Sequence, residues 1–285
     1  MYGPLSSTRN EPGNMHDAPR ASRGSPLGDS SDASSTAHAV REMFGRVAPR
    51  YDFLNHFLSL GRDIAWRNAA ARELRATLSQ PGSVAVDVCC GTGDLALALA
   101  RYSAGKVLGA DFSRPMLERA RGKARTSRRA VHFLEADTLQ LPFADASLDA
   151  ISAAFGFRNL ADYGRGLREM HRVLRPGGMA AILEFSSVRW PVFGPVFRFY
   201  FHHILPRLGT WISGVRGPYQ YLPQSVALFP DQEQLAAALR ETGFTQVRHR
   251  NFFGGVAALH LGRKGPLPVI PANAGIHCGP PLSRG

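Results

Sequence analysis

A short buried-strand pattern that runs directly into a glycine-containing turn constrains this chain more than any other feature. Residues 83–88 read Ser-Val-Ala-Val-Asp-Val, and the turn Cys89-Cys90-Gly91-Thr92-Gly93 follows them. The pattern predicts a helix from Asp94 to Arg101 and a second strand from Lys106 to Ala110. A strand, a helix and a second strand in this order form a βαβ unit, whose two strands are parallel. The sequence therefore predicts an α/β fold.

The same alternation continues along the chain. Helical spacing of apolar residues precedes the first strand, over residues 38–58 and from Trp66 to Leu78. The later pattern predicts three further strands, at Val131–Glu135, Leu148–Ala153 and Met179–Phe185, and two closing strands, at Gln246–Phe252 and Val256–Gly262. It also predicts three helices, one from Ser113, one over Ala161–Leu174 and one over Asp231–Thr242. The helix over Ala161–Leu174 is expected to stop at Arg175-Pro176-Gly177-Gly178. We therefore expect a Rossmann-like, doubly wound, mostly parallel seven-stranded sheet with an antiparallel C-terminal hairpin, which binds its ligand beyond the carboxyl ends of the strands.

Composition divides the chain into three parts. Residues 1–37 are rich in Ser, Pro, Gly and Arg and predict a disordered leader, and residues 265–285 predict an unstructured tail. Residues 38–264 are expected to form one domain with a helical cover at its N-terminal end. The sequence shows no signal-peptide pattern and no apolar run near the roughly 18 residues of a membrane-spanning helix, so a cytoplasmic location is expected.

The strongly basic composition invites a nucleic-acid function. The formal net charge is +12, but the arginines are scattered through the folded part in no single block. We interpret the charge mainly as solvated helix faces, with attraction to an anionic membrane surface as the alternative, and expect no nucleic-acid partner. Cys89, Cys90 and Cys278 form neither a disulfide framework nor a zinc spacing. His202-His203 has no third ligand at helical spacing, so no metal site is expected.

Charges around the first turn distinguish between cofactors. Gly91-Thr92-Gly93 with Ala96 satisfies a relaxed dinucleotide fingerprint, and Asp111 stands where an acidic residue holds ribose hydroxyls. Asp94, at the start of the helix, would compete with a pyrophosphate there. A cationic adenosine cofactor, S-adenosylmethionine, would tolerate Asp94 and Asp87.

Each of these acids also has a simpler explanation. Asp94 can cap a helix and Asp111 can be a solvated carboxylate at the end of a strand. Asp137, which follows Glu135 at the end of the third strand, can bind an adenine amino group or serve as a turn residue before Leu139.

Motifs along residues 40–264 identify a family resemblance. These are Met43-Phe44, Arg50-Tyr51-Asp52-Phe53-Leu54-Asn55, Ser59-Leu60-Gly61, Asp87 to Asp94, Asp111, Leu141-Pro142-Phe143, Phe155-Gly156-Phe157-Arg158-Asn159, Arg172 to Gly178, Leu183-Glu184-Phe185-Ser186, Tyr219 to Ser225, and Phe229-Pro230-Asp231-Gln232. With them the chain resembles the class I S-adenosylmethionine-dependent methyltransferases. More specifically, it is similar to the quinone-biosynthesis C-methyltransferases that act on demethylmenaquinol and on 2-polyprenyl-6-methoxy-1,4-benzoquinol.

The resemblance implies a cofactor site and a substrate. It assigns cofactor binding to the turn residues and to the ends of the second and third strands: Asp87, Gly91, Thr92, Gly93, Asp111, Asp137 and Thr138. Ala154 departs from the pattern, because the family often has a cofactor-binding Ser there. Cys89-Cys90 and Asp111-Phe112-Ser113 favour the menaquinone branch, so demethylmenaquinol is the expected substrate.

Methylation of a ring carbon needs an electron-rich quinol, so a phenolic proton must leave as the bond forms. Arg158 is the leading candidate to stabilise the oxyanion, and a salt bridge in a surface loop is its simpler explanation. Asp52 and His202 are the candidate bases, with His203 and Tyr219 as further ones, and Cys89 and Cys90 are expected to pack rather than react. The expected substrate-binding residues are Tyr51, Asn55, Phe155, Asn159, Tyr219 and Tyr221.

An aromatic segment from Trp190 to Trp211 has two readings. It can be a helix that faces the core, or an apolar lid that accepts a prenyl tail and rests on the inner face of the cell membrane. A homo-oligomer also remains open. Three other functions stay as alternatives: a methyltransferase of another small molecule or RNA, a nicotinamide oxidoreductase, and a scaffold that kept the fold without activity.

Overall fold

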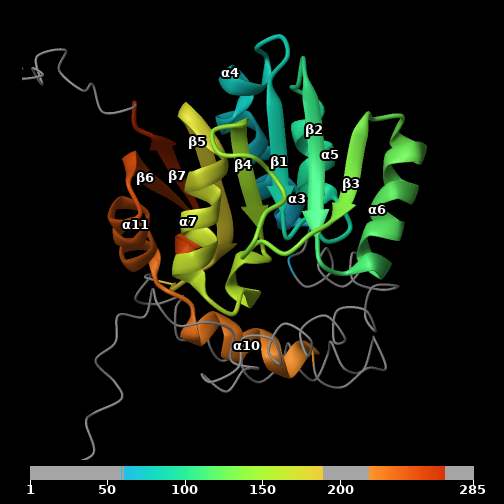
Figure 1. Cartoon of the computed structure of the whole chain (residues 1–285). Helices are drawn as coiled ribbons and strands as arrows, with labels where there is room; N and C mark the ends of the chain where they lie inside the picture. The colour runs from blue at the N-terminus through green and yellow to red at the C-terminus, as the bar shows by residue number, and fades with distance from the viewer. Residues whose placement is uncertain (1–58, 60, 189–217, 267–285) are drawn as a thin grey trace, which may run out of the picture.

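A computed structural model describes Ser59, residues 61–188 and residues 218–266 of the 285-residue chain. Its centre is one seven-stranded sheet in the order β3-β2-β1-β4-β5-β7-β6 (Figure 1). The strands are β1 Val84–Val88, β2 Lys106–Asp111, β3 Val131–Glu135, β4 Leu148–Ala154, β5 Leu174–Phe185, β6 Phe244–Phe252 and β7 Ala257–Lys264. The helices are α3 Arg62–Glu73, α4 Arg75–Leu78, α5 Asp94–Leu99, α6 Arg114–Ser127, α7 Tyr163–Val173, α10 Pro218–Leu228 and α11 Gln232–Glu241, with 3-10 turns η2 Phe157–Asn159 and η4 Phe253–Gly255.

Strand pairing confirms the expected sheet. β1 is parallel to β2 and β4, β2 to β3, and β4 to β5. β7 runs antiparallel to both β5 and β6, so the closing strands form the predicted hairpin. The hairpin is inserted with its second strand inward, because β7 pairs with β5 and β6 is left at the edge. The chain has the predicted Rossmann-like α/β architecture.

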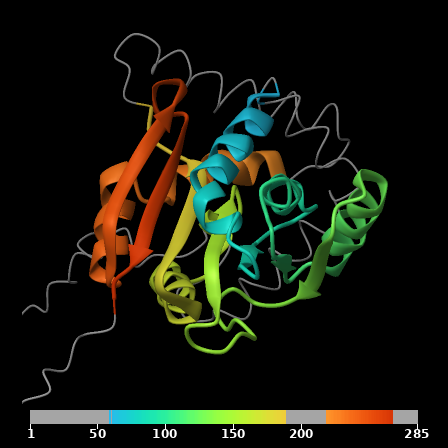
Figure 2. The same cartoon turned by 90° about the horizontal axis from the view of Figure 1, so that it is seen from above.

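Two apolar cores lie on opposite faces of the sheet. Alternate strand residues point to opposite faces, so Val86 and Ile182 join one core with residues of α7 and α11. Ala85 and Leu183 join the other, with residues of α3, α4 and α5. Figure 2 looks along the sheet, with α3 on one side and α7 on the other. The exposed ends of the strands are the surface left for a site.

The start of β5 differs from the prediction. The expected helix stop at residues 175–178 lies inside β5, whose Leu174 pairs with Leu148 before Met179 pairs with Ala150. Residues 175–178 therefore bulge opposite the single residue Asp149. Gly177 has φ +81°, and a Cβ at Gly178 would lie 2.9 Å from the Arg175 carbonyl oxygen. The Pro and Gly residues thus shape a bulge rather than a loop.

Three further elements differ in detail. The helix expected from Trp66 to Leu78 divides at Leu74 into α3 and α4. Ser113 stands at the predicted N-cap of α6, but its side chain makes no capping hydrogen bond. α10 was not predicted, and it contains Pro223, a residue that argues against a helix interior.

Other predictions concern residues that the structure does not describe. They are the leader 1–37, the helix over 38–58, the segment 190–211 and nearly all of the tail 265–285. In the part of the chain that is described, no helix is long and apolar enough to cross a membrane.

Candidate active site

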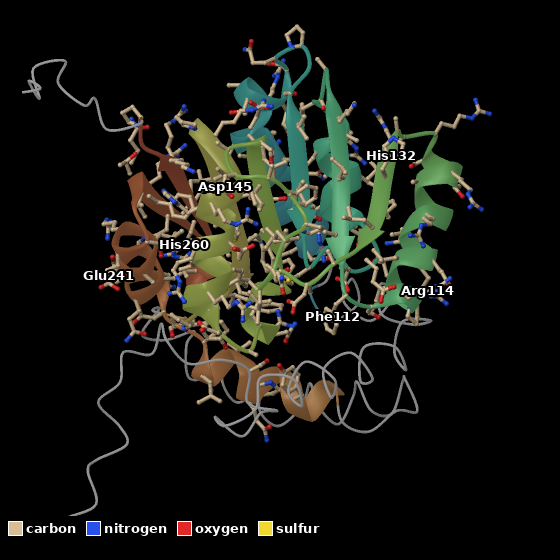
Figure 3. All side chains as sticks on the ribbon, in the orientation of Figure 1. Phe112, Arg114, His132, Asp145, Glu241 and His260 are labelled. Carbon is tan, nitrogen blue, oxygen red and sulfur yellow. The ribbon has the colours of Figure 1, made fainter. Side chains whose placement is uncertain are left out.

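A narrow pocket lies at the carboxyl ends of β1, β2 and β4. The strand order reverses here, since β1 has β2 on one side and β4 on the other. Such a switch point leaves a crevice in which α/β proteins bind ligands. The pocket is lined by Cys89, Gly91, Asp111, Phe112, Met116, Phe155, Gly156, Asn159 and Leu160. Phe112 marks this end of the sheet in Figure 3.

The turn after β1 needs glycine for two different reasons. Gly91 has φ +54° and no atom within 4 Å of the position a Cβ would take, so its backbone faces open space in the pocket. Gly93 has φ +84°, and a Cβ there would lie 2.9 Å from the Phe133 ring. Gly91 therefore exposes its backbone to a ligand, and Gly93 lets the start of α5 pack closely against the Phe133 ring.

Asp111 joins the end of β2 to this turn. Its Oδ2 accepts a 2.8 Å hydrogen bond from the Gly91 N–H, and its Oδ1 accepts one of 2.8 Å from the Ser113 N–H. The side chain is buried at 6 % exposure and also lines the pocket. The alternative of a solvated strand-end carboxylate does not describe it. Because a carboxylate has about four acceptor positions, Asp111 can accept further hydrogen bonds from ribose hydroxyls.

Asp87 lies beneath the turn rather than in the pocket lining. Ser152 donates a 2.7 Å hydrogen bond to its Oδ1, and both side chains are buried. Burial raises the pKa of the Asp87 carboxyl to about 7, against the opposing effects of the Ser152 hydrogen bond and the charge of Arg67. Asp87 thus supports the turn from below.

Lys123 connects α6 to the turn after β1 and to the start of α5. Its Nζ lies 2.9 Å from Thr92 Oγ1 and forms an ion pair with Asp94. The Thr92 hydroxyl therefore serves as an acceptor for α6, and the negative charge of Asp94 is balanced within the protein. The argument that Asp94 attracts a cationic cofactor is weakened by this pair. Sequence reasoning missed Lys123, because nothing local links it to residues about thirty positions earlier.

The predicted residues after β3 lie in different surroundings. Asp137 is exposed and accepts a 2.8 Å hydrogen bond from the Leu139 N–H, which is the turn role considered for it. Thr138 is buried, with its Oγ1 3.3 Å from Cys89 Sγ in the pocket wall. Burial raises the pKa values of Cys89 and Cys90 well above the usual thiol range, so neither is a thiolate at neutral pH.

The opposite wall follows β4. Phe155 adopts φ +57°, a left-handed conformation that is rare for an aromatic residue, and it lines the pocket with Gly156 and Asn159. The Tyr221 hydroxyl donates a 3.0 Å hydrogen bond to Asn159 Oδ1, which ties α10 to this wall. Three predicted substrate-binding residues, Phe155, Asn159 and Tyr221, are thus brought together. Ala154, the departure from the family pattern, packs against the apolar core.

Arg158 is close to the site but does not line the pocket. Its side chain is only 6 % exposed, and its Nη1 lies 2.7 Å from Glu184 Oε1. Nη1 also donates to the Phe155 carbonyl oxygen, and Glu184 Oε2 accepts a 3.2 Å bond from the Arg158 N–H. The salt bridge considered for this residue therefore exists, inside the protein instead of on its surface. Glu184 was assigned no role from the sequence, although a carboxylate in a buried strand is itself a signal of a charged partner.

A second buried ion pair lies against the ring of Phe155. Arg67 pairs with Asp63 on α3, and its guanidinium lies 5.1 Å from the centre of the Phe155 ring. Ser59 donates a 2.7 Å hydrogen bond to Asp63. Sequence reasoning did not single out Arg67 or Asp63, since helical charges four residues apart are usually exposed.

Several candidates lie outside the described residues: Tyr51, Asp52, Asn55, His202 and His203. Tyr219 belongs to α10, but its side chain is not described. Over the described ranges, no group of three His, Cys, Asp or Glu side chains could hold a metal ion.

Comparison with known proteins identifies a family that the chain matches. The model of the ubiE/COQ5 methyltransferase family matches residues 31–264. The chain is 49% identical over 240 residues to the demethylmenaquinone methyltransferase of Deinococcus radiodurans, covering 84% of this chain and 97% of that protein. It is 48% identical over 221 residues to the protein of that name from Thermus thermophilus, covering 77% and 99%. A ubiquinone/menaquinone biosynthesis C-methyltransferase UbiE from Geotalea uraniireducens is 41% identical, with 79% and 96% covered.

Solved structures agree on the fold. The crystal structure of the 4+2 cyclase SpnF has a TM-score of 0.59 at 19% identity and covers 86% of this chain and 99% of its own. A SAM-dependent methyltransferase from Aquifex aeolicus has a TM-score of 0.50 at 19% identity, with 68% and 88% covered. At these identities the likeness concerns the fold alone.

Proposed function

The chain belongs to the ubiE/COQ5 methyltransferase family, and from that premise we propose that it transfers a methyl group from S-adenosylmethionine to a ring carbon of a prenylated quinol. Demethylmenaquinol is the expected acceptor, because the relatives with 49% and 48% identity are named demethylmenaquinone methyltransferases. The UbiE relatives make 2-polyprenyl-6-methoxy-1,4-benzoquinol the second acceptor to test. The observation that carries the proposal is the family match over residues 31–264 together with a pocket at the switch point of the sheet.

The residues around the turn fit S-adenosylmethionine. Open space in front of Gly91 would admit the cofactor close to the backbone, and the Asp111 carboxylate can hold ribose hydroxyls. When bound there, the cofactor supplies an activated methyl group on a sulfonium centre. We assign Gly91, Asp111 and the Phe112 ring to direct contact. Asp87, Thr92, Gly93 and Thr138 support the turn, and Asp137 remains a candidate for the adenine amino group.

Asn159 and Tyr221 are proposed to orient the quinol. The Tyr221 hydroxyl donates to Asn159 Oδ1, which leaves the Asn159 amide hydrogens to donate to a quinol oxygen. Phe155 supplies an apolar surface beside them. A pocket poor in water favours this reaction, because an anionic quinol and a cationic cofactor become neutral products.

Arg158 is proposed to act together with Glu184. The guanidinium beside the pocket wall favours a negative charge on the quinol oxygen. Glu184 holds Arg158 in place, with Oε1 on the guanidinium and Oε2 on the Arg158 backbone N–H. Asp52 and His202 stay the candidate bases, with Tyr51, Asn55 and Tyr219 as further substrate contacts. The folded domain is proposed to span residues 38–264.

Peripheral contact with a membrane is proposed at the pocket edge. β6 is parallel to β5, so η4 after β6 lies at the same edge as the pocket. There Phe253 is 43% exposed, and Ile64 on the first turn of α3 is 49% exposed. Arg62 stacks on the Phe253 ring at 4.7 Å, which brings α3 beside η4. Aromatic, aliphatic and cationic side chains in one place suit the interface of an anionic bilayer.

The function is tested by transfer of labelled methyl from S-adenosylmethionine to reduced demethylmenaquinone and, in parallel, to the demethylated prenyl-benzoquinol. We expect transfer to the naphthoquinol to exceed transfer to the benzoquinol. Asp111→Asn should raise the KM for the cofactor about tenfold, through loss of a charge-assisted hydrogen bond. Tyr221→Phe should lower kcat and leave that KM unchanged.

Glu241→Gln is the matched carboxylate control, because Glu241 is exposed at the end of α11 (Figure 3). Cofactor binding without transfer to either quinol would refute the substrate class. Absence of cofactor binding would refute the site.

A further inference from the structure

A hollow lined by arginines lies at the far end of the sheet from the pocket. It has a volume of about 430 Å³ and is lined by Arg121, Ala124, Arg125, Arg128, Arg129, Ala130 and Val131. These residues come from the last two turns of α6, its C-cap and the start of β3. In Figure 3, His132 marks this end of the sheet and Arg114 marks the other. The length of α6, about 20 Å at 1.5 Å per residue, separates the hollow from the pocket.

The side chains that line the hollow carry four positive charges and no negative one. Arg121 is anchored, since its Nη2 donates a 3.1 Å hydrogen bond to the Phe133 carbonyl oxygen. Arg125, Arg128 and Arg129 are exposed, and no acidic side chain in the described ranges pairs with them. The other acidic partners of α6 are engaged elsewhere: Glu118 lies near Arg114 on the same helix, and Asp94 of α5 is paired with Lys123.

Helix capping does not account for these arginines. The Arg129 N–H donates to the Ala124 carbonyl and the Arg128 N–H to the Arg125 carbonyl, so the backbone itself closes the helix. The macrodipole at a helix C-terminus is equivalent to about half a negative charge, far less than four positive charges. The remaining charge repels itself unless an anion balances it.

The conformation of Arg128 adds an independent observation. It has φ +53°, at the one position of the helix end where glycine is strongly favoured. The left-handed backbone conformation of Arg128 is unfavourable for any residue that has a Cβ atom. Its guanidinium extends the group formed by Arg125 and Arg129.

We propose that this hollow binds a phosphate-bearing anion. Guanidinium groups donate paired hydrogen bonds that match the geometry of phosphate oxygens, and several of them suit a multiply charged group better than a single carboxylate. The hollow lies at the start of β3, at the opposite end of the sheet from the edge where Ile64 and Phe253 are exposed, so a bilayer at the pocket does not reach it. The expected ligand is therefore a free phosphate compound, with a lipid headgroup as the other source of the same chemistry.

The test measures binding of inorganic pyrophosphate to the full chain by calorimetry at constant ionic strength, with chloride as the reference anion. We expect Arg125→Gln combined with Arg129→Gln to weaken binding at least tenfold. The matched control is Arg165→Gln combined with Arg168→Gln, two exposed arginines on α7, which should leave the affinity unchanged. A second arm uses vesicles of phosphatidylcholine with phosphatidylglycerol. If the Arg125 and Arg129 variant loses both vesicle binding and pyrophosphate binding, the lipid headgroup is assigned as a second source of the bound phosphate group.

Arg128→Gly separates binding from folding. Glycine relieves the left-handed backbone strain, so this variant should melt at a higher temperature while it binds pyrophosphate more weakly. The proposal is overturned if pyrophosphate does not bind, or if it binds equally well to the Arg125 and Arg129 variant. It is also overturned if only vesicles or RNA depend on these arginines, since the hollow would then be part of a macromolecular docking surface.

Discussion

Asp87 illustrates at residue scale how a carboxyl can support a site without entering it. It is buried under the turn after β1, where Ser152 donates to it, and its pKa is raised to about 7. In the unfolded chain its pKa is close to 3.8, the ordinary value for an aspartate side chain. The folded state therefore binds the proton more tightly. The stabilisation from that proton is fully present at low pH and is lost as the pH rises through 7.

This linkage predicts a pH-dependent stability. Between pH 6 and pH 8, the contribution of Asp87 to the free energy of unfolding should fall by about 1 kcal/mol in the cofactor-free protein. Urea denaturation at the two pH values measures it, with Asp87→Asn as the reference that lacks the titration. Ser152→Ala removes a hydrogen bond that favours the ionised form, so it should move the loss to higher pH. A wild-type protein and an Asp87→Asn variant with equal pH dependence would contradict the prediction.

The Arg158–Glu184 pair allows structure and chemistry to be separated. Arg158→Met leaves Glu184 charged and buried without its partner, which should destabilise the fold by about 3 to 5 kcal/mol. The double variant Arg158→Met with Glu184→Gln removes both charges and should recover most of that loss. Thermal unfolding and methyl transfer are then measured on all three proteins.

The double variant decides the role of Arg158. If the guanidinium stabilises the quinol oxyanion, the refolded double variant should bind the cofactor normally and have a kcat lowered at least a hundredfold, about 3 kcal/mol. Activity restored together with stability would mean that the pair only supports the wall.

At the scale of elements, the site depends on the contact between two turns. The turn after β1 and the turn after β4 meet where Cys89 faces Gly156, and a Cβ at Gly156 would lie 2.5 Å from Cys89 Cβ. Cys89 itself has φ +50°, so glycine is acceptable there. The two turns together line the pocket.

Gly156→Ala should therefore push the turns apart and lower methyl transfer at least tenfold, with a higher KM for the cofactor. Adding Cys89→Gly removes the opposing Cβ but leaves the Cys89 carbonyl oxygen 2.9 Å from the new methyl group, so it should restore part of the activity. Steady-state kinetics of the single and double variants measure this compensation. A double variant no better than Gly156→Ala would show that the contact does not set the geometry.

Local patterns predicted the elements well where a run of residues that favour strands is followed directly by a turn. The third strand, Val131–Glu135, was predicted with its observed bounds, although Val131 is its only buried residue. β5 begins earlier than expected, since pairing with Leu148 holds a Pro and Gly sequence in a bulge. α10 was missed because Pro223 argues against a helix.

At the scale of the whole molecule, the site was predictable where the βαβ unit fixes it. Gly91 follows β1 and Asp111 is the last residue of β2, which is parallel to β1, so the fold brings them to one edge, and they are joined by a hydrogen bond. The partners of Thr92 and Arg158 were not predictable, because Lys123 and Glu184 approach them only through packing between elements. Their side chains are consequently occupied by contacts that the motifs do not reveal.

The order of the sheet has a consequence for folding during synthesis. Among the strands of this sheet, β7 is the last to be made, yet it lies between β5 and β6. Until residues 257–264 are available, β5 has an unpaired edge and β6 has no neighbour in the sheet. Nascent chains that end after β6 should remain sensitive to protease, and chains that include β7 should become resistant in one step. The sheet is therefore completed only after β7 has been made, so the domain commits to its native state at that step of synthesis.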